Sequence, residues 1–415
     1  MKHLFAILTA ALAALCCQAQ QAMVGSWTGK LSVGVAELSL VLNVTTDDNG
    51  AMQCTLDSPD QGAKGIPATV DHCTDDSIAV SIKAIGASYG ALRTGDELQG
   101  TFTQMGRSFP LNFRRGTITR NRPQEPIAPF PYDDEEVVFT NVADMATLCG
   151  TLTYPVGYEK MNPADVPVVL MVTGSGAQNR NEELMGHKPF LVIADYLARN
   201  GIASLRYDDR ATGKSTGGDV KSATTLNFAH DAKAGYERLK SMKKFGKIGI
   251  LGHSEGANIA FILGAWEKAD FVVSLAAVGV KGDTALTAQA NRVMKLNGMD
   301  GGVSTRDYRN VVLLQNQPWL NWFIDYDPSP HIAATHCPVF AANGDKDCQV
   351  IAGLNLGGIK ATLPAGAHNR FVEYPGLNHL FQECTTGAPT EYGTIEQTIS
   401  PQVLKDITEW IKNLK

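Results

Sequence analysis

A serine between two glycines, in the segment GILGHSEGANIA at residues 249–260, is the first feature that could carry chemistry. Gly252-His253-Ser254-Glu255-Gly256 fits the pattern Gly-x-Ser-x-Gly, with an apolar run before it and a helical stretch after it. Glycines at both ends let a strand turn tightly into a helix, which leaves the serine hydroxyl exposed at the turn. The pattern predicts a nucleophile at Ser254; the alternative is an ordinary strand-to-helix junction.

A serine hydroxyl is a poor nucleophile until a base accepts its proton, and an acid must orient that base. Among the nine histidines, His379 in EYPGLNHLF is the one placed after the last predicted strand. FAANGDKDCQV supplies two carboxylates, Asp345 and Asp347, just after another predicted strand. We therefore expect Ser254 and His379 to act together, with two aspartates as candidates for the acid and a surface-loop histidine as the alternative reading of His379.

These candidates lie in a region, residues 136–415, where short apolar runs alternate with helical stretches. VPVVLMVTG, GIASLRYD and FVVSLAAV are such runs, and PFLVIADYLARNG has apolar residues at helical spacing. Short buried strands alternating with helices predict an α/β fold with a mostly parallel sheet covered on both faces. A segment at about 279–335 separates two of the runs and is predicted as an insert of one or two helices.

With this order of elements, residues 136–415 resemble the α/β-hydrolase superfamily. The resemblance implies that the insert at about 279–335 is a lid. LRYDDRATGKSTG, taken with GSGAQNRNEE, GHKPF and DKDCQV, is most similar to its secreted esterase and serine-aminopeptidase-like branch. In that fold the acid follows the serine in the chain and the histidine comes last. The resemblance also implies an acid loop of the form Gly-x-x-Asp-x-x-Val, which lands on Gly344, Asp347 and Val350 and favours Asp347 over Asp345.

The resemblance further implies two backbone N–H groups that stabilise an oxyanion. One is that of Glu255, the residue after the nucleophile, and the other that of Ser175 in MVTGSGAQNRNEE. Family members usually carry His-Gly at this point, whereas this chain has Thr173-Gly174. The change keeps the donor at Ser175 but leaves open what braces the loop, and a merely flexible Gly-Ser-Gly turn is the alternative.

Two further groups are predicted to be mainly structural. The charged residues of LRYDDR are expected to form an ion network rather than to bind substrate: Arg206, Asp208 and Arg210. The insert carries four aromatic residues, of which at least two are expected to pack against the sheet and one or two to line an acyl or aryl pocket: Trp319, Trp322, Phe323 and Tyr326. The insert is modest in length, which predicts an open site suited to small or exposed esters.

Residues 24–115 have a different hydrophobic pattern, in which apolar and polar residues alternate strictly. ELSLVLNV and SIAVSIKA alternate in this way, and DDNG and TGDE provide turns between such runs. The pattern predicts a small antiparallel barrel or sandwich. Its GSWTG opening resembles the Gly-x-Trp start of lipocalin-like barrels, with Trp27 expected in the core. Residues 116–135 hold prolines 123, 126, 129 and 131 and are predicted as a linker.

The first 19 residues, MKHLFAILTAALAALCCQA, have a positive start, an apolar middle and small residues near Ala19. This is the pattern of a cleavable secretory signal, and the apolar stretch is shorter than the roughly 20 residues of a membrane span. Lipid attachment at Cys16 or Cys17 is the weaker alternative, because neither follows a small residue. We therefore expect a secreted or periplasmic protein without a membrane span.

Export makes disulfides possible for the six cysteines that remain after cleavage. Cys54 and Cys73 are the predicted pair, since both fall in the β-rich region. No Cys-x-x-Cys spacing and no His/Cys cluster indicates zinc, so the sequence predicts neither a metal nor an organic cofactor.

Overall composition narrows the class of partner. The 415 residues are 44% hydrophobic and 19% charged, with a formal net charge of −6 and no basic run. Such a chain is not expected to bind nucleic acid, which needs clustered lysine and arginine. The sequence thus predicts an exported serine hydrolase that cleaves short acyl esters, on small molecules or carbohydrates. Two alternatives are a serine aminopeptidase-like peptidase, with Glu182 and Glu183 reading an amine, and a binding protein whose barrel is the functional part.

Overall fold

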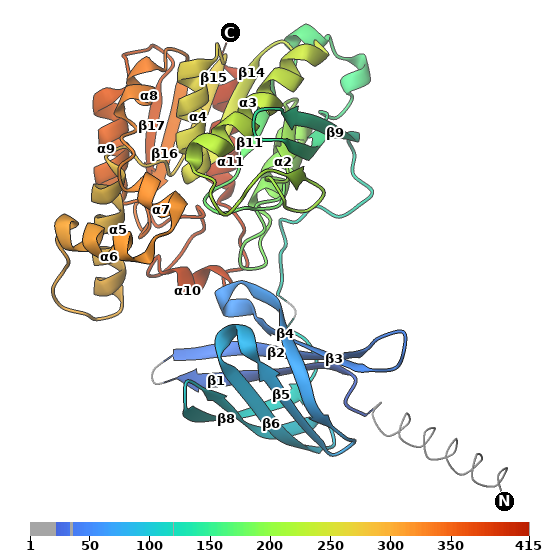
Figure 1. Cartoon of the computed structure of the whole chain (residues 1–415). Coiled ribbons are helices and arrows are strands. Elements are labelled where there is room, and N and C mark those ends of the chain that lie inside the picture. The colour runs from blue at the N-terminus through green and yellow to red at the C-terminus, as the bar shows by residue number, and fades with distance from the viewer. Residues whose placement is uncertain (1–21, 34–35, 119, 415) are drawn as a thin grey trace, which may run out of the picture. The chain divides into compact units, whose positions relative to one another are not determined.

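The computed structural model describes residues 22–33, 36–118 and 120–414, which divide into two compact units at residues 121 and 122 (Figure 1). The predicted secretory signal at residues 1–19, with Cys16 and Cys17, lies outside the described residues. Across those described ranges, no helix is both long enough and apolar enough to cross a bilayer.

The first unit is a closed barrel of eight antiparallel strands, each paired with its neighbour in the sequence. The strands are β1 (Gly25–Val33), β2 (Ala36–Thr46), β3 (Met52–Ser58), β4 (Ala63–Cys73), β5 (Ser77–Ile82), β6 (Ala87–Thr94), β7 (Glu97–Gln104) and β8 (Arg107–Arg115). The barrel closes between β1 and β8, where Trp27 is opposite Arg115 and Gly29 opposite Phe113. Closure removes the exposed edges that an open sheet of this size would leave.

The interior of the barrel is filled with side chains. Trp27, Leu42 and Phe113 are fully buried, and the Trp27 indole N–H donates to the Met23 carbonyl oxygen at 2.8 Å. Arg115 covers the Trp27 ring at 4.3 Å from its centroid. The expected core position of Trp27 is confirmed.

The predicted disulfide between Cys54 and Cys73 is wrong, because both are free thiols in the structure. Cys54 is opposite Ala68 in β4, whereas Cys73 ends that strand opposite Ile78. Cys73 is five positions beyond Ala68 along β4, with a β-bulge between Val70 and His72, so the two cysteines are not cross-strand partners.

The second unit is built on a mixed nine-stranded sheet in the order β13-β10-β12-β11-β14-β15-β16-β17, with β9 paired to β10. The strands are β9 (Asp134–Asn141), β10 (Ala146–Thr153), β11 (Val168–Val172), β12 (Ala203–Tyr207), β13 (Thr216–Gly217), β14 (Ile248–His253), β15 (Phe271–Leu275), β16 (Val339–Gly344) and β17 (Arg370–Tyr374). The six strands from β12 to β17 in this order are parallel, and β10 pairs antiparallel with β9, β12 and β13. The predicted mostly parallel sheet is confirmed.

Helices cover both faces of this sheet (Figure 1). One group comprises α2 (Pro189–Arg199) and α11 (Pro401–Lys412), which contact each other, while α3 (Thr225–Met242), α4 (Glu255–Trp266), α8 (Ser329–Ala334) and α9 (Ala352–Thr362) form a connected layer. Every residue of β11, β12 and β15 is buried, as expected for strands covered on both sides. A short helix, α10 (Pro389–Tyr392), precedes α11.

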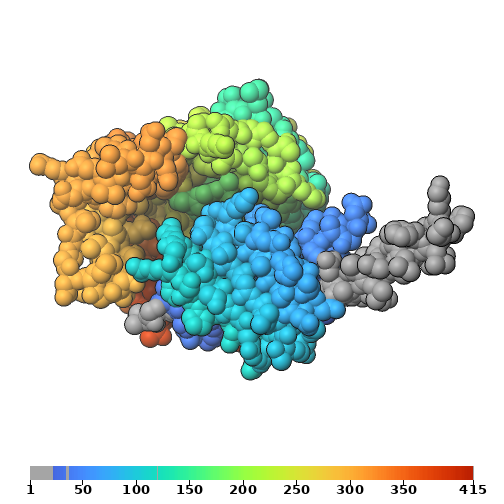
Figure 2. Space-filling model, turned by 60° about the horizontal axis from the view of Figure 1, so that its bottom comes forward, coloured from blue at the N-terminus to red at the C-terminus, as the bar shows by residue number. Residues whose placement is uncertain are grey.

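The segment between β15 and β16 forms four helices rather than the one or two expected. These are α5 (Gly282–Leu296), α6 (Thr305–Gln315), α7 (Pro318–Phe323) and α8. The second expected helix is divided because Asn316 has a left-handed φ of 49° and Pro318 begins a new helix. In Figure 2 the golden segment that holds α5 and α6 projects at the side of the second unit.

Candidate active site

Ser254 occupies a strained turn between β14 and α4. Its φ is 55° and its ψ −120°, a conformation that non-glycine residues rarely adopt, and its N–H donates to the Leu275 carbonyl oxygen at 2.8 Å. Such strain persists where the surrounding structure enforces it, and it concentrates at functional sites. The turn presents Ser254 at the carboxyl edge of the parallel sheet, as the sequence predicts.

The two flanking glycines are required by close approach of the backbone. A Cβ atom at Gly252 would lie 2.0 Å from the Gly256 carbonyl oxygen. One at Gly256 would lie 2.1 Å from the carbonyl oxygen of Val172 in β11. Any side chain at either position would therefore push the strand and the helix apart.

Asp347 and His379 are brought together from the loops after β16 and β17. The Nδ1 atom of His379 lies 2.7 Å from Oδ2 of Asp347, and both side chains are at most 5% exposed. The other carboxylate oxygen of Asp347 accepts the N–H groups of Gln349 at 2.8 Å and Val350 at 2.9 Å. Asp347 can therefore fix the orientation of the imidazole, which leaves Nε2 of His379 available to accept a proton.

His379 lies beside the serine turn through a contact with His253. The Nε2 atom of His253, the residue before Ser254, lies 2.9 Å from the His379 carbonyl oxygen, and the two ring centroids are 4.8 Å apart. The His379 loop is itself tied together by Asn378, whose side-chain oxygen accepts the N–H groups of Leu380 and Gln382, each at 3.0 Å.

The second candidate acid, Asp345, has a different part in the structure. It is exposed, and its carboxylate accepts the Gly376 N–H at 2.6 Å. It therefore braces the two loops that carry Asp347 and His379 without contacting the imidazole. This is the loop-capping position expected for the aspartate that is not the acid.

The loop of Thr173 and Ser175 follows β11 and passes along the serine turn. A Cβ atom at Gly174 would lie 3.3 Å from the Cβ atom of Ser254. The expected donors, the N–H groups of Ser175 and Glu255, therefore belong to segments on either side of Ser254.

Asp209 stabilises this loop, and the sequence left open which residue does so. One of its oxygens accepts the Thr173 hydroxyl at 2.9 Å and the Gln178 N–H at 2.8 Å. Burial raises the pKa of Asp209 to about 8. Asp209 was not among the predicted site residues, because nothing in LRYDDR distinguishes it from its neighbour Asp208.

The Glu255 side chain joins the serine turn to the insert. Its Oε1 accepts the Trp319 indole N–H at 2.8 Å and the Thr225 hydroxyl at 2.5 Å. Burial raises the pKa of Glu255, and hydrogen bonds from Thr225, Trp319 and Ser175 offset only part of this rise. Of the four aromatic residues of the insert, Phe323 and Tyr326 are buried, which confirms their expected packing, and Trp319 and Trp322 are half-buried.

Part of the second unit is similar to a known protein family. The family model described as Hydrolase_4, serine aminopeptidase, S33, matches residues 188–321, which include Ser254 and most of the insert. Residues 122–415 have the α/β-hydrolase fold and are called the hydrolase domain below.

The chain also has a curated relative, esterase EstD of Thermotoga maritima. The two chains are 28% identical over 180 residues, which is 42% of this chain. The chain thus spans 40% of the length of this relative.

Two solved esterase structures are similar as well. Esterase Pf2001 of Pyrococcus furiosus is 19% identical over 72% of this chain and 98% of its own, with a TM-score of 0.46. Est1E of Butyrivibrio proteoclasticus, solved with ferulic acid, is 16% identical over 66% of this chain and 96% of its own, with a TM-score of 0.45.

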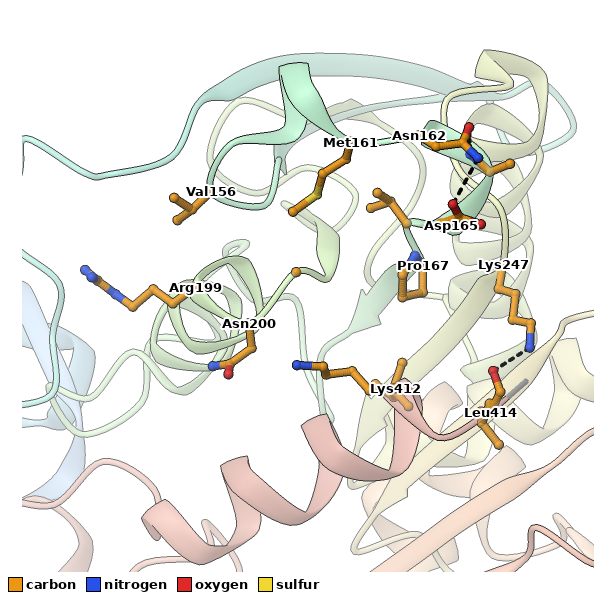
Figure 3. A pocket seen from close by; sticks show the side chains of 14 residues that line it. Val156, Met161, Asn162, Asp165, Pro167, Arg199, Asn200, Lys247, Lys412 and Leu414 are labelled. Carbon is orange, nitrogen blue, oxygen red and sulfur yellow. Dashed lines mark hydrogen bonds between the residues drawn. The ribbon is translucent and has the colours of Figure 1, made fainter.

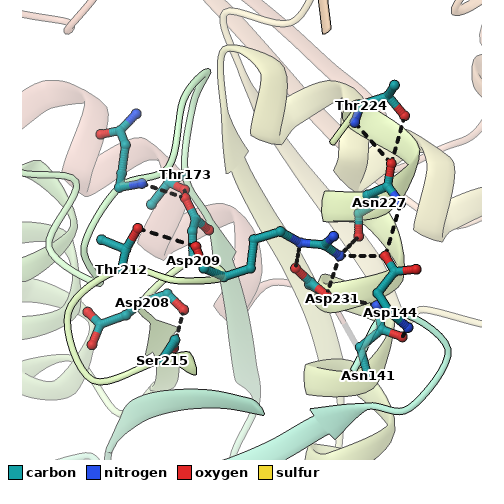
Figure 4. A network of polar contacts seen from close by, with 12 residues as sticks. Asn141, Asp144, Thr173, Asp208, Asp209, Thr212, Ser215, Thr224, Asn227 and Asp231 are labelled. Atoms are coloured by element: carbon teal, nitrogen blue, oxygen red, sulfur yellow. Dashed lines mark hydrogen bonds and ion pairs between the residues drawn. The ribbon is translucent and has the colours of Figure 1, made fainter. Parts of the chain in front are cut away.

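The charged residues of the LRYDDR segment form ion pairs or hydrogen bonds with other residues of the hydrolase domain, not with one another. Arg210 holds Asp231 through two bonds of 2.7 and 2.8 Å and reaches Asp144 at 2.6 Å (Figure 4). Asp208 pairs with Arg180 at 2.7 Å. The predicted structural role is thus confirmed for Arg210 and Asp208. Arg206 is buried and donates to the side-chain oxygen of Asn181 at 2.5 Å, and burial lowers the pKa of Arg206 to about 10.

Asp231→Ala is expected to destabilise the protein by about 3–5 kcal/mol, because it leaves the buried Arg210 guanidinium without its two-point partner. Both side chains are only 1% exposed. Urea unfolding of the full chain measures the change. Glu409→Ala is the control, since its 3.9 Å pair with Lys405 is exposed and is expected to contribute less than about 1 kcal/mol. Equal effects of the two substitutions would contradict the prediction.

A hollow of about 860 Å³ in the hydrolase domain does not have Ser254 among its lining residues (Figure 3). It is lined by segments that precede the parallel strands, such as Val166 before β11 and Lys247 before β14, and by the end of α11. Ligands of open parallel sheets bind at the carboxyl ends of the strands. We therefore assign this hollow no part in the chemistry at Ser254.

Within residues 22–33, 36–118 and 120–414, no group of three or more histidine, cysteine or acidic side chains has the proximity needed to hold a metal ion.

Proposed function

We propose that the protein is an exported serine hydrolase, a carboxylesterase acting on short acyl esters. The observation that carries the proposal is the 2.7 Å contact between Asp347 and His379 at the sheet edge that also presents the strained Ser254. Three groups in the order serine, acid, histidine supply a nucleophile, an orienting acid and a base. The similarity to esterase EstD supports an ester as the substrate.

In the proposed reaction the Ser254 oxygen attacks the ester carbonyl carbon while its proton moves to Nε2 of His379. The negative charge that forms on the carbonyl oxygen is stabilised by the N–H groups of Ser175 and Glu255. The carbon–oxygen bond to the alcohol then breaks, and His379 returns the proton to the departing oxygen. Water, deprotonated by His379, hydrolyses the acyl-enzyme by the same steps and regenerates Ser254.

A peptidase is the second candidate, favoured by the description of the matching family model as a serine aminopeptidase. The two glutamates considered for binding the amino group of a substrate do not support a peptidase. Glu182 is 2% exposed and its carboxylate is bound to His253, while Glu183 is exposed and bonds to Asn179 at 3.3 Å. The esterase is therefore the better supported function.

A fluorophosphonate probe tests the nucleophile, and a paired substrate panel tests the reaction. We expect labelling at Ser254, release of alcohol from short p-nitrophenyl esters, and no release of amine from aminoacyl p-nitroanilides. Acylated sugars added to the panel test the carbohydrate-linked class. Absence of labelling would favour a binding protein on this fold, and turnover of the anilides alone would favour the peptidase.

A further inference from the structure

A second buried carboxylate–imidazole pair lies beside the proposed catalytic one. Oε1 of Glu182 is 2.9 Å from Nδ1 of His253, and both side chains are at most 9% exposed. Glu182 lies in the loop between β11 and α2 with a φ of 52°, a left-handed conformation that is unfavourable for a residue other than glycine. The side-chain contacts of Glu182 must therefore hold this backbone in place.

The surroundings of His253 favour a doubly protonated ring. Oε1 of Glu182 also accepts the Gly174 N–H at 2.8 Å, which suits an ionised carboxylate. The other ring nitrogen of His253 lies 2.9 Å from the carbonyl oxygen of His379, which has no proton to donate, so this nitrogen donates. Opposite an ionised Glu182 both ring nitrogens donate, and His253 is then an imidazolium paired with a carboxylate.

The pair is sealed by apolar side chains. Phe190, Leu275 and Phe381 are among the residues that line a void of about 10 Å³ next to Glu182 and His253. This is at the lower limit of space for a water molecule, and the lining offers few polar partners. With little water to compete, the interaction between the two charges is stronger than at the surface.

The two ends of the pair hold the two loops on which the proposed reaction depends. Glu182 fixes Gly174, the residue before the oxyanion donor Ser175, and His253 fixes the backbone of the base His379. We propose that Glu182 and His253 are positioning residues whose ion pair sets the oxyanion loop and the catalytic histidine relative to Ser254. This inference rests on the proposed function and adds two residues that touch neither substrate nor reacting atoms.

The charge on His253 makes this arrangement sensitive to pH. Burial by itself lowers the pKa of His253, but the Glu182 carboxylate, with smaller effects from the His379 carbonyl and Asp347, raises it above the ordinary value. The charged groups facing the ring are thus Glu182 and Asp347, with the His379 ring alongside. The pair stabilises the fold fully below the ordinary pKa of about 6.5 and loses this effect as the pH rises through the raised value.

Glu182→Gln tests the proposal, with Glu183→Gln as the matched control for loss of an adjacent, exposed carboxylate. We expect Glu182→Gln to lower kcat for a p-nitrophenyl ester by about 10- to 100-fold while KM stays within about threefold. We also expect the alkaline decline of kcat to begin at lower pH, because His253 loses its proton more readily without the carboxylate. Glu183→Gln is expected to match the wild type in both respects.

A second measurement needs no active variant. The ¹H–¹⁵N spectrum of the histidine side chains of the full chain, with His253→Asn to assign the signal, is expected to show both ring nitrogens of His253 protonated at pH 7. A neutral His253 ring, or a wild-type kcat and pH profile for Glu182→Gln, overturns the proposal. If the wild-type protein hydrolyses no ester and Ser254 is not labelled, the proposed function and the positioning role fall together, whereas the ring protonation still decides whether the ion pair exists.

Discussion

Ser254→Ala is expected to lower kcat for short p-nitrophenyl esters by about 10⁴- to 10⁶-fold and to abolish fluorophosphonate labelling. The substitution removes the only atom proposed to bond to the acyl carbon, while the oxyanion donors and the fold stay in place. The residual rate is then that of water attack within an otherwise intact site. Alanine is smaller than serine and can take the same backbone conformation in the turn, so the variant is expected to fold.

Steady-state kinetics on the purified full chain measure the effect, and Ser241→Ala is the control. Ser241 is an exposed serine near the end of α3 whose hydroxyl donates to the Arg238 carbonyl oxygen. It is expected to leave kcat unchanged. Ester turnover by Ser254→Ala at the wild-type rate would exclude Ser254 as the nucleophile.

Asp347→Asn is expected to lower kcat by about 10³- to 10⁴-fold, the second largest effect. An asparagine amide in place of Oδ2 donates a proton toward Nδ1 of His379, which places the ring proton on Nε2. The tautomer that results cannot accept the Ser254 proton. The oxygen that accepts the N–H groups of Gln349 and Val350 is retained, so the loop is expected to keep its conformation.

Asp345→Asn is the matched control, since it makes the same chemical change two residues away. Asparagine can still accept the Gly376 N–H that Asp345 accepts. We expect a kcat within about twofold of the wild type, the range of a surface substitution of about 0.5 kcal/mol. A larger loss in Asp345→Asn than in Asp347→Asn would reverse the assignment of the acid.

Much of the hydrolase domain follows from local patterns in the sequence. Runs such as VPVVLMV and FVVSLAAV predict buried strands because nearly all of their residues are apolar, and β11 and β15 are found there. The insert shows where this fails. Its second helix was expected to be continuous, but Asn316 and Pro318 divide it into α6 and α7.

Some residues of the site contact segments that are far from them in the sequence, and no motif or periodicity identifies such residues. Asp209 braces Thr173, and Glu182 holds Gly174 and His253, over separations that no periodicity or motif marks. Glu182 was considered together with Glu183 as a pair that recognises an amine, because a sequence does not show that one of two adjacent glutamates is buried. The disulfide expected between Cys54 and Cys73 failed for the same reason, since sharing a β domain does not bring two residues together.

The sequence by itself determined the nucleophile candidate, since glycines at fixed spacing around Ser254 are a local requirement of a tight turn. It also ordered the acid and the histidine, because parallel strands deliver their following loops to one edge of the sheet. Only the tertiary structure decided which acid meets His379, what braces the oxyanion loop, and that His253 faces two acceptors. These depend on distances between segments far apart in the chain, and such distances are set by packing rather than by local sequence.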